Sequence, residues 1–126
     1  MPYKNILLID DDDDDQEIFL AALREISSSV QYNYVNNARK ALEKLASGEI
    51  IPEVIFLDLN MPMMTGQEFL AHIKKVEKLS EIPVIIFSTS ADPSTKQLTK
   101  QLGARDYITK PGDFDQLVNI LQPFII

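Results

Sequence analysis

The amino-acid sequence predicts an α/β fold class, with a five-stranded parallel sheet that is covered by helices on both faces. Two observations lead to this prediction. Short apolar runs alternate with helical patterns along the whole chain, and the three clearest runs, at 6–9, 54–57 and 84–87, are apolar at consecutive positions. A strand that is covered on both faces has this pattern, whereas a half-exposed strand alternates apolar and polar residues.

The predicted elements follow one another as five pairs of a strand and a helix. The expected strands are Lys4–Ile9, Val30–Asn36, Glu53–Asp58, Pro83–Ser88 and Asp106–Thr109. After each strand, apolar residues recur three or four positions apart, as on one face of a helix. These residues are Phe19, Ala22, Leu23 and Ile26, then Ala38, Ala41, Leu42 and Leu45, then Phe69, Ile73 and Val76, then Leu98 and Leu102, and finally Leu117, Ile120, Leu121 and Phe124.

Several residues mark the expected ends of these helices. Residues 13–15 are acidic and begin the first helix, where negative charge suits the helix macrodipole. Gly48 and Gly103 are placed to end the second and fourth helices. Asp92, which precedes a proline, and Asp113 are expected to begin the fourth and fifth helices.

The last residues form a short apolar tail. Pro123 is expected to end the fifth helix and to leave Phe124–Ile126 beyond it. An apolar tail of this kind folds back onto the core or joins an interface. For this tail we predict a homodimer contact.

Composition and charge exclude several functional classes. A chain of 126 residues is long enough for one domain, and its net charge of −7 argues against nucleic acid or an anionic membrane as a direct partner. The absence of cysteine excludes disulfides, thiolate zinc sites and cysteine nucleophiles. With no signal-peptide pattern and no stretch long enough to span a bilayer, the expected location is the cytoplasm.

Six consecutive aspartates, residues 10–15, follow the first strand directly. In a parallel sheet, ligands bind at the carboxyl ends of the strands. Carboxylates collected at one point cannot all stay ionised unaided, and Mg²⁺ is a hard cation that carboxylate oxygens hold. The strand ends bring together three carboxylates, a hydroxyl and an ammonium: Asp10, Asp11, Asp58, Ser88 and Lys110.

This set of groups indicates phosphoryl transfer to a carboxylate. An ionised aspartate is a sufficient nucleophile towards an activated phosphoryl group and needs no general base. Mg²⁺, a lysine and a hydroxyl would neutralise charge on the phosphoryl oxygens. The remaining aspartates, 12–15, are expected to be a solvated loop or helix N-terminal charge.

Four motifs, in order along the chain, resemble the receiver domain of two-component response regulators. They are Ile9-Asp10-Asp11, Leu57-Asp58-Leu59-Asn60-Met61-Pro62 with Gly66, Ser88, and Gly103-Ala104 leading to Tyr107-Ile108-Thr109-Lys110-Pro111. The resemblance covers essentially the whole chain. The segments 10–19 and 114–117 are similar to the single-domain branch that includes regulators paired with bacterial phytochromes. The resemblance implies a flavodoxin-like (βα)5 fold of strand order 2-1-3-4-5, with 1–126 as a single receiver domain without an output domain.

The resemblance also implies roles for the site residues. Asp58 is the expected phosphoacceptor. Asp11 is an expected direct Mg²⁺ ligand, Asp10 acts largely through water, and Asn60 contributes its backbone carbonyl. Ser88 is the expected switch hydroxyl that turns towards the phosphoryl group.

Three further residues receive roles from the resemblance. Lys110 is expected to pair with a phosphoryl oxygen, and with Asp58 before phosphorylation. Tyr107 is expected to move inward as Ser88 moves. The bond between Lys110 and Pro111 is expected to be cis, which helps to aim the lysine.

The function implied is a phosphorelay switch and not a conventional enzyme. A sensor histidine kinase or a phosphotransfer protein is the expected partner, and the surface of the fourth helix, fifth strand and fifth helix is expected to change. The domain would promote its own dephosphorylation at a rate tuned by Asn60 and Ser90.

The alternative is a Mg²⁺-dependent phosphatase of haloacid-dehalogenase-like type that uses Asp10 as its nucleophile. The two functions differ in which aspartate becomes phosphorylated. A flavin-binding protein is disfavoured because six carboxylates would repel its phosphate.

Overall fold

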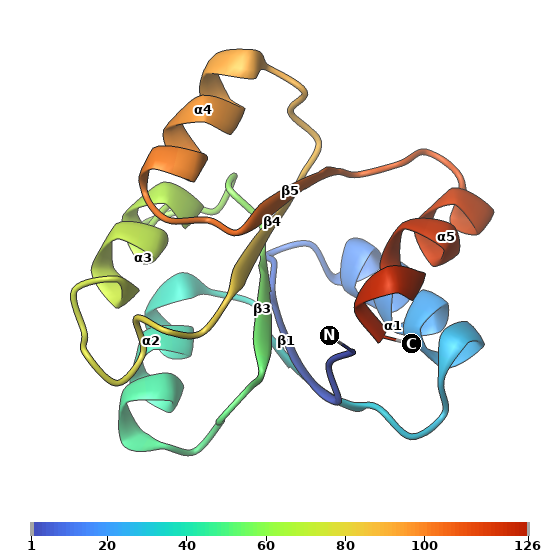
Figure 1. Cartoon of the computed structure of the whole chain (residues 1–126), viewed down its shortest axis with the longest axis horizontal. Coiled ribbons are helices and arrows are strands. Elements are labelled where there is room, and N and C mark those ends of the chain that lie inside the picture. Colours follow the sequence, from blue (N-terminus) through green and yellow to red (C-terminus); the bar gives the residue numbers. More distant parts are fainter. Residues whose placement is uncertain (1, 126) are drawn as a thin grey trace.

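A computed structural model describes residues 2–125 as one parallel sheet with the predicted strand order β2-β1-β3-β4-β5 (Figure 1). The strands are β1 (Asn5–Ile9), β2 (Gln31–Val35), β3 (Val54–Leu57), β4 (Val84–Ser88) and β5 (Asp106–Thr109). The helices are α1 (Asp13–Ile26), α2 (Ala38–Ser47), α3 (Gly66–Ile73), α4 (Pro93–Gln101) and α5 (Phe114–Ile125). The predicted fold class is confirmed, and the first four predicted strands are each one or two residues too long.

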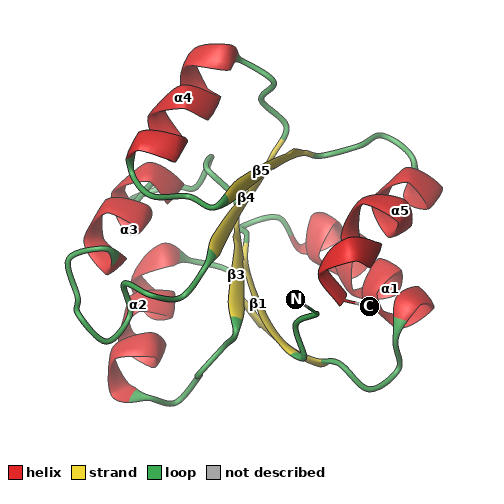
Figure 2. Cartoon of the chain, viewed as in Figure 1, coloured by secondary structure: helices red, strands yellow, loops and turns green. Residues whose placement is uncertain are grey.

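The helices form two layers, one on each face of the sheet (Figure 2). Helices α1 and α5 cover one face, and α2, α3 and α4 cover the other. Side chains of β1 alternate between the layers, as the pleat of a strand requires. Ile6 and Leu8 belong to the core cluster under α1 and α5, whereas Leu7 and Ile9 belong to the opposite one.

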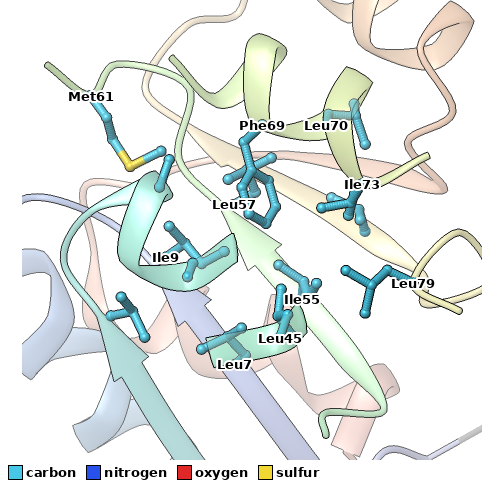
Figure 3. Packing of buried hydrophobic residues seen from close by; sticks show 14 of the residues in the cluster. Leu7, Ile9, Leu45, Ile55, Leu57, Met61, Phe69, Leu70, Ile73 and Leu79 are labelled. Atoms are coloured by element: carbon cyan, nitrogen blue, oxygen red, sulfur yellow. The ribbon is translucent and has the colours of Figure 1, made fainter. Parts of the chain in front are cut away.

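The larger core cluster shows why the central strands are apolar at every position. Leu7 and Ile55 lie beside Leu45 of α2, and Leu57 lies beside Phe69 of α3 (Figure 3). The second face is filled in the same way around Phe19, whose ring meets the Phe56 ring edge-on at 5.2 Å between centroids. Burial on both faces excludes water from the strands and leaves only their ends open to ligands.

The predicted helix ends are largely confirmed. The side chain of Asp12 caps α1 by accepting hydrogen bonds from the backbone N–H groups of Asp14 and Asp15. Gly48 ends α2 in the left-handed region, with φ of 80°. Gly103, with φ of 109°, lies one residue beyond the Leu102 cap of α4.

The prediction that Pro123 ends the fifth helix is wrong, because α5 continues through it to Ile125. Proline removes one helical hydrogen bond, but tertiary contacts hold the last turn in place. Phe124 meets the ring of Phe56 edge-on at 5.8 Å, its carbonyl accepts a hydrogen bond from the Tyr3 N–H, and Ile125 is buried. This part of the tail therefore folds back onto the core of its own chain, and the homodimer contact stays a prediction. Ile126 lies outside the described residues.

Candidate functional site

The three predicted carboxylates meet at one edge of the sheet. Asp10 and Asp11 follow β1, and Asp58 follows β3. Strands β1 and β3 pair in register up to Ile9 and Leu57, and the Asp58 N–H donates to the Ile9 carbonyl at 2.9 Å. One carboxylate oxygen from each aspartate lies within 4.8 Å of the others. The predicted cluster is thus present, with Asp10 and Asp58 buried and Asp11 exposed.

Lys110 supplies the positive charge of the site from the end of β5. Its backbone N–H donates to the Ser88 carbonyl at 2.7 Å, which ties the β5 end to β4. Its ammonium Nζ lies 3.6 Å from Asp58 Oδ1, so the expected ion pair is present. The shorter contacts are to other carboxylates, at 2.9 Å to Asp10 Oδ2 and 2.7 Å to Asp15 Oδ2. Lys110 is therefore hydrogen-bonded to Asp10 and Asp15 and only loosely paired with Asp58.

The predicted cis bond between Lys110 and Pro111 is wrong, since no peptide bond among residues 2–125 is cis. The two isomers of a bond before proline differ little in energy, so the surrounding contacts select one. Here the backbone and side-chain hydrogen bonds of Lys110 aim its ammonium into the site across a trans bond.

Burial sets the protonation behaviour of the two enclosed carboxylates. Burial raises the pKa of Asp58 to about 6, with Lys110 opposing the rise and Asp10 adding to it. Burial likewise raises the pKa of Asp10, against the hydrogen bonds from the Asp12 N–H and from Lys110. Burial would lower the pKa of Lys110, but its hydrogen bonds to Asp15 and Asp10 outweigh this and raise it. The lysine is a fixed cation, and Asp58 is poised to lose its proton just below neutral pH.

The donor set suits a hard divalent cation. The clustered ligand atoms are carboxylate oxygens, which Mg²⁺ prefers, and three carboxylates face a single ammonium. Burial is the main cause of the raised pKa values of Asp10 and Asp58, and the neighbouring carboxylates add to it. Asn60, whose backbone carbonyl is the further expected ligand, is exposed two residues after Asp58.

The side chains of Ser88 and Tyr107 both form hydrogen bonds with the backbone of Ser90. The fully buried Ser88 hydroxyl accepts a hydrogen bond from the Ser90 N–H at 3.2 Å. The Tyr107 hydroxyl donates to the Ser90 carbonyl at 2.7 Å. Tyr107 is half-buried, and the ammonium of Lys96 lies 5.5 Å from its ring centroid. One peptide segment therefore links the two predicted switch residues.

The sequence predicts only solvated or helix N-terminal charge for Asp15, as for Asp12–Asp14, and so misses its hydrogen bond with Lys110. The structure separates these four residues. Asp12 caps α1, Asp13 accepts a hydrogen bond from the Tyr34 hydroxyl at 2.9 Å, and Asp14 is exposed. Asp15 lies in the first turn of α1, four residues before the buried Phe19. Residues four positions apart lie on the same face of a helix, so this spacing could have shown that Asp15 turns inward.

Comparison with known proteins shows the family of this chain. A family model described as the response regulator receiver domain matches residues 6–122. The chain belongs to this family. The phosphorylated cyanobacterial phytochrome response regulator RcpA superposes with a TM-score of 0.87 at 30% identity, covering 96% of this chain and 90% of that one. The bacteriophytochrome response regulator RtBRR gives a TM-score of 0.80 at 32% identity, covering 100% and 80%.

Curated relatives place the receiver domain in proteins of different length. The two-component response regulator ORR3 of Oryza sativa subsp. indica is 31% identical over 94% of this chain and 90% of its own length. The chain spans 31% of a protein-glutamate methylesterase/protein-glutamine glutaminase of Syntrophomonas wolfei and 62% of the rice regulator ORR6, at 34% and 37% identity. The shared part is the receiver domain in each case. Within residues 2–125, no helix has the length and apolarity needed to cross a membrane.

Proposed function

We propose that this receiver domain is a phosphorelay switch in which Asp58 accepts a phosphoryl group from the phosphohistidine of a sensor kinase or phosphotransfer protein. An oxygen of the Asp58 carboxylate forms a bond to phosphorus, the phosphorus–nitrogen bond breaks, and its electron pair stays on the imidazole. The observation that supports this proposal is the placement of Asp58 beside two further carboxylates and 3.6 Å from the Lys110 ammonium.

The hydrogen bonds of the site favour Asp58 over Asp10 as the nucleophile. Asp10 has no exposed surface, and its two oxygens are engaged by the Asp12 N–H at 2.9 Å and by Lys110 at 2.9 Å. Asp58 retains 5% exposure and pairs with Lys110 only at 3.6 Å, with the backbone N–H of Asn60 as a further hydrogen-bond partner of its carboxylate. The alternative phosphatase, which needs Asp10 to attack, has no support from the comparisons either.

We propose that Mg²⁺ is held by Asp10, Asp11 and Asp58, with the Asn60 carbonyl as a further ligand. When bound, it supplies positive charge that neutralises the phosphoryl oxygens. The carboxylate cluster supports this assignment, because its ligand atoms are oxygens that lie within 4.8 Å of one another. A solved neighbour with a TM-score of 0.82 and 26% identity, the response regulator Rcp1, is described in an Mn²⁺-bound form.

The connection through Ser90 supports the proposed switch. If the Ser88 hydroxyl turns towards a phosphoryl oxygen, the Ser90 N–H loses its acceptor and the segment can move. The Tyr107 hydroxyl donates to the carbonyl of the same residue, so the tyrosine ring would move together with this segment. The surface of α4, β5 and α5 would change as a result, because Tyr107 lies on β5 beside α4. Attack of water on phosphorus would later release inorganic phosphate and restore the Asp58 carboxylate.

The experiment that tests the proposal is intact-mass spectrometry after incubation with acetyl phosphate and Mg²⁺. Wild type should gain one phosphoryl adduct that requires Mg²⁺ and is removed by hydroxylamine, as an acyl phosphate is. Asp58→Asn should gain none. Asp10→Asn should still be modified, although more slowly, because it keeps the nucleophile and loses one metal ligand. An adduct that persists in Asp58→Asn would overturn the assignment and return attention to Asp10.

A further inference from the structure

The ammonium of Lys110 makes its shortest contact with Asp15, a residue outside the proposed phosphoacceptor and metal set. The distance from Nζ to Asp15 Oδ2 is 2.7 Å, against 2.9 Å to Asp10 Oδ2 and 3.6 Å to Asp58 Oδ1. The carboxylate of Asp15 comes from the first turn of α1, far from Lys110 in sequence, and its side chain is 33% exposed at the mouth of the site.

An ammonium has three N–H donors, and the geometry assigns two of them. Asp10 accepts one and Asp15 accepts another. Asp58 Oδ1, at 3.6 Å, is too far to accept the third as a hydrogen bond. That donor remains available to an oxygen that arrives on Asp58. Without Asp15, the second N–H of Lys110 would be free to form a hydrogen bond with Asp58. That hydrogen bond would oppose the attack of the Asp58 carboxylate on phosphorus.

Packing alone does not fix the ammonium in this position. A cavity of about 60 Å³ lies beside the lysine stem. Phe87 lines this cavity, and Nζ lies 5.2 Å from the centroid of its ring, within reach of a cation–π contact. The side chain therefore has space beside it, and the hydrogen bonds to Asp10 and Asp15 are the closest polar contacts of its charge. The residues around the cavity are Asp15, Ile18, Phe87, Lys110, Pro111 and Leu117.

We propose that Asp15 is a positioning residue that holds Lys110 off Asp58, so that Asp58 stays free to attack and the third N–H stays free for the phosphoryl group. The consequence for phosphorylation rests on the proposed function, whereas the placement of the ammonium does not. Asp15 would act in the reaction only through Lys110, without touching the phosphoryl donor itself.

Asp14 offers a matched control. It has the same side chain, lies in the same first turn of α1 and is exposed, and its carboxylate has no hydrogen-bond partner among the described residues. Asp15→Asn and Asp14→Asn remove the same charge at similar places, so any difference between them reports the contact with Lys110. Asp15→Glu keeps the charge on a longer side chain and serves as the conservative variant.

Two measurements test the inference. At saturating Mg²⁺, Asp15→Asn should be phosphorylated by acetyl phosphate about fivefold more slowly than Asp14→Asn, the effect of losing a partly exposed ion pair, with part of the rate restored in Asp15→Glu. In the unphosphorylated protein, the ¹H–¹⁵N NMR signal of the Lys110 ammonium, assigned by its loss in Lys110→Arg, should shift or broaden in Asp15→Asn and not in Asp14→Asn.

The outcomes separate the two proposals. Equal rates and equal ammonium signals in Asp15→Asn and Asp14→Asn would overturn the positioning role, whatever happens at Asp58. A Lys110 ammonium signal that depends on Asp15 would support the placement of Lys110 by Asp15. If the same protein is never phosphorylated, the proposed function is overturned and the placement of Lys110 is not.

Discussion

Replacing Asp58 by asparagine should stabilise the protein near neutral pH in the absence of divalent cations. Asparagine has nearly the same shape and cannot ionise, and Lys110 keeps its hydrogen bonds to Asp10 and Asp15 in the variant. Burial raises the pKa of Asp58 from 3.8 to about 6, so the folded protein resists ionisation of this carboxyl. At about 1.4 kcal/mol for each pKa unit, that interval corresponds to about 3 kcal/mol.

The sign of the pH dependence follows from the raised pKa. Between 3.8 and about 6, the folded state binds the proton more tightly than the unfolded state does, so the stability of wild type falls as pH rises through that window. Asp58→Asn lacks this fall. The difference in unfolding free energy should be near zero below the window and should reach its full value of about 3 kcal/mol above it.

Urea unfolding followed by circular dichroism, in buffer with a chelator and at several pH values across the window, measures this difference. Other titrating groups contribute to both proteins and largely cancel. Added Mg²⁺ should stabilise wild type more than Asp58→Asn, because a ligand stabilises the state that binds it. A difference that does not vary with pH, or a variant less stable than wild type near neutral pH, would refute the reasoning.

Three further predictions concern single residues. Gly66→Ala should destabilise the fold by about 3 kcal/mol or more in urea unfolding, because the new Cβ would lie 2.4 Å from the Asp58 carbonyl oxygen, whereas Gly112→Ala meets nothing within 4 Å. Ser88→Ala should lose about 1 kcal/mol with its hydrogen bond and should still be phosphorylated, but the NMR signals of β5 should no longer respond to phosphorylation. Phe124→Ala should cost about 2 kcal/mol through lost packing of its half-buried ring, with no change in sedimentation.

Each of these predictions has a contradicting outcome. Equal stability of Gly66→Ala and Gly112→Ala would show that the β3–α3 connection can shift at little cost. A full response of β5 to phosphorylation in Ser88→Ala would remove the link through Ser90. A loss of mass in sedimentation of Phe124→Ala, without loss of stability, would favour the homodimer contact over packing against the core.

The sequence was sufficient to predict the sheet and the carboxylates, the lysine and the hydroxyl at its edge. Continuous burial of the central strands leaves an unmistakable pattern, and parallel strands bring their carboxyl ends together whatever the side chains are. The pattern therefore predicts that Asp10, Asp58 and Ser88 lie together at the carboxyl edge of the sheet. The errors arose where two local possibilities differ little in energy. Pro123 lies inside α5, where tertiary contacts hold the last turn, and the bond before Pro111 is trans. Both outcomes depend on residues that are distant in the sequence, so the neighbouring residues do not predict them.

The run of six aspartates shows the same limit at the level of single side chains. Identical residues in a row carry no local signal that distinguishes them, yet each one points in a different direction once β1 ends and α1 begins. The cap made by Asp12 fixes where the helix starts, and the start fixes the helical phase that carries Asp15 to Lys110. Exposed acidic neighbours such as Asp14 add negative charge without a partner. The position of the helix start, and not the charge of the run, therefore decides which carboxylates serve the site.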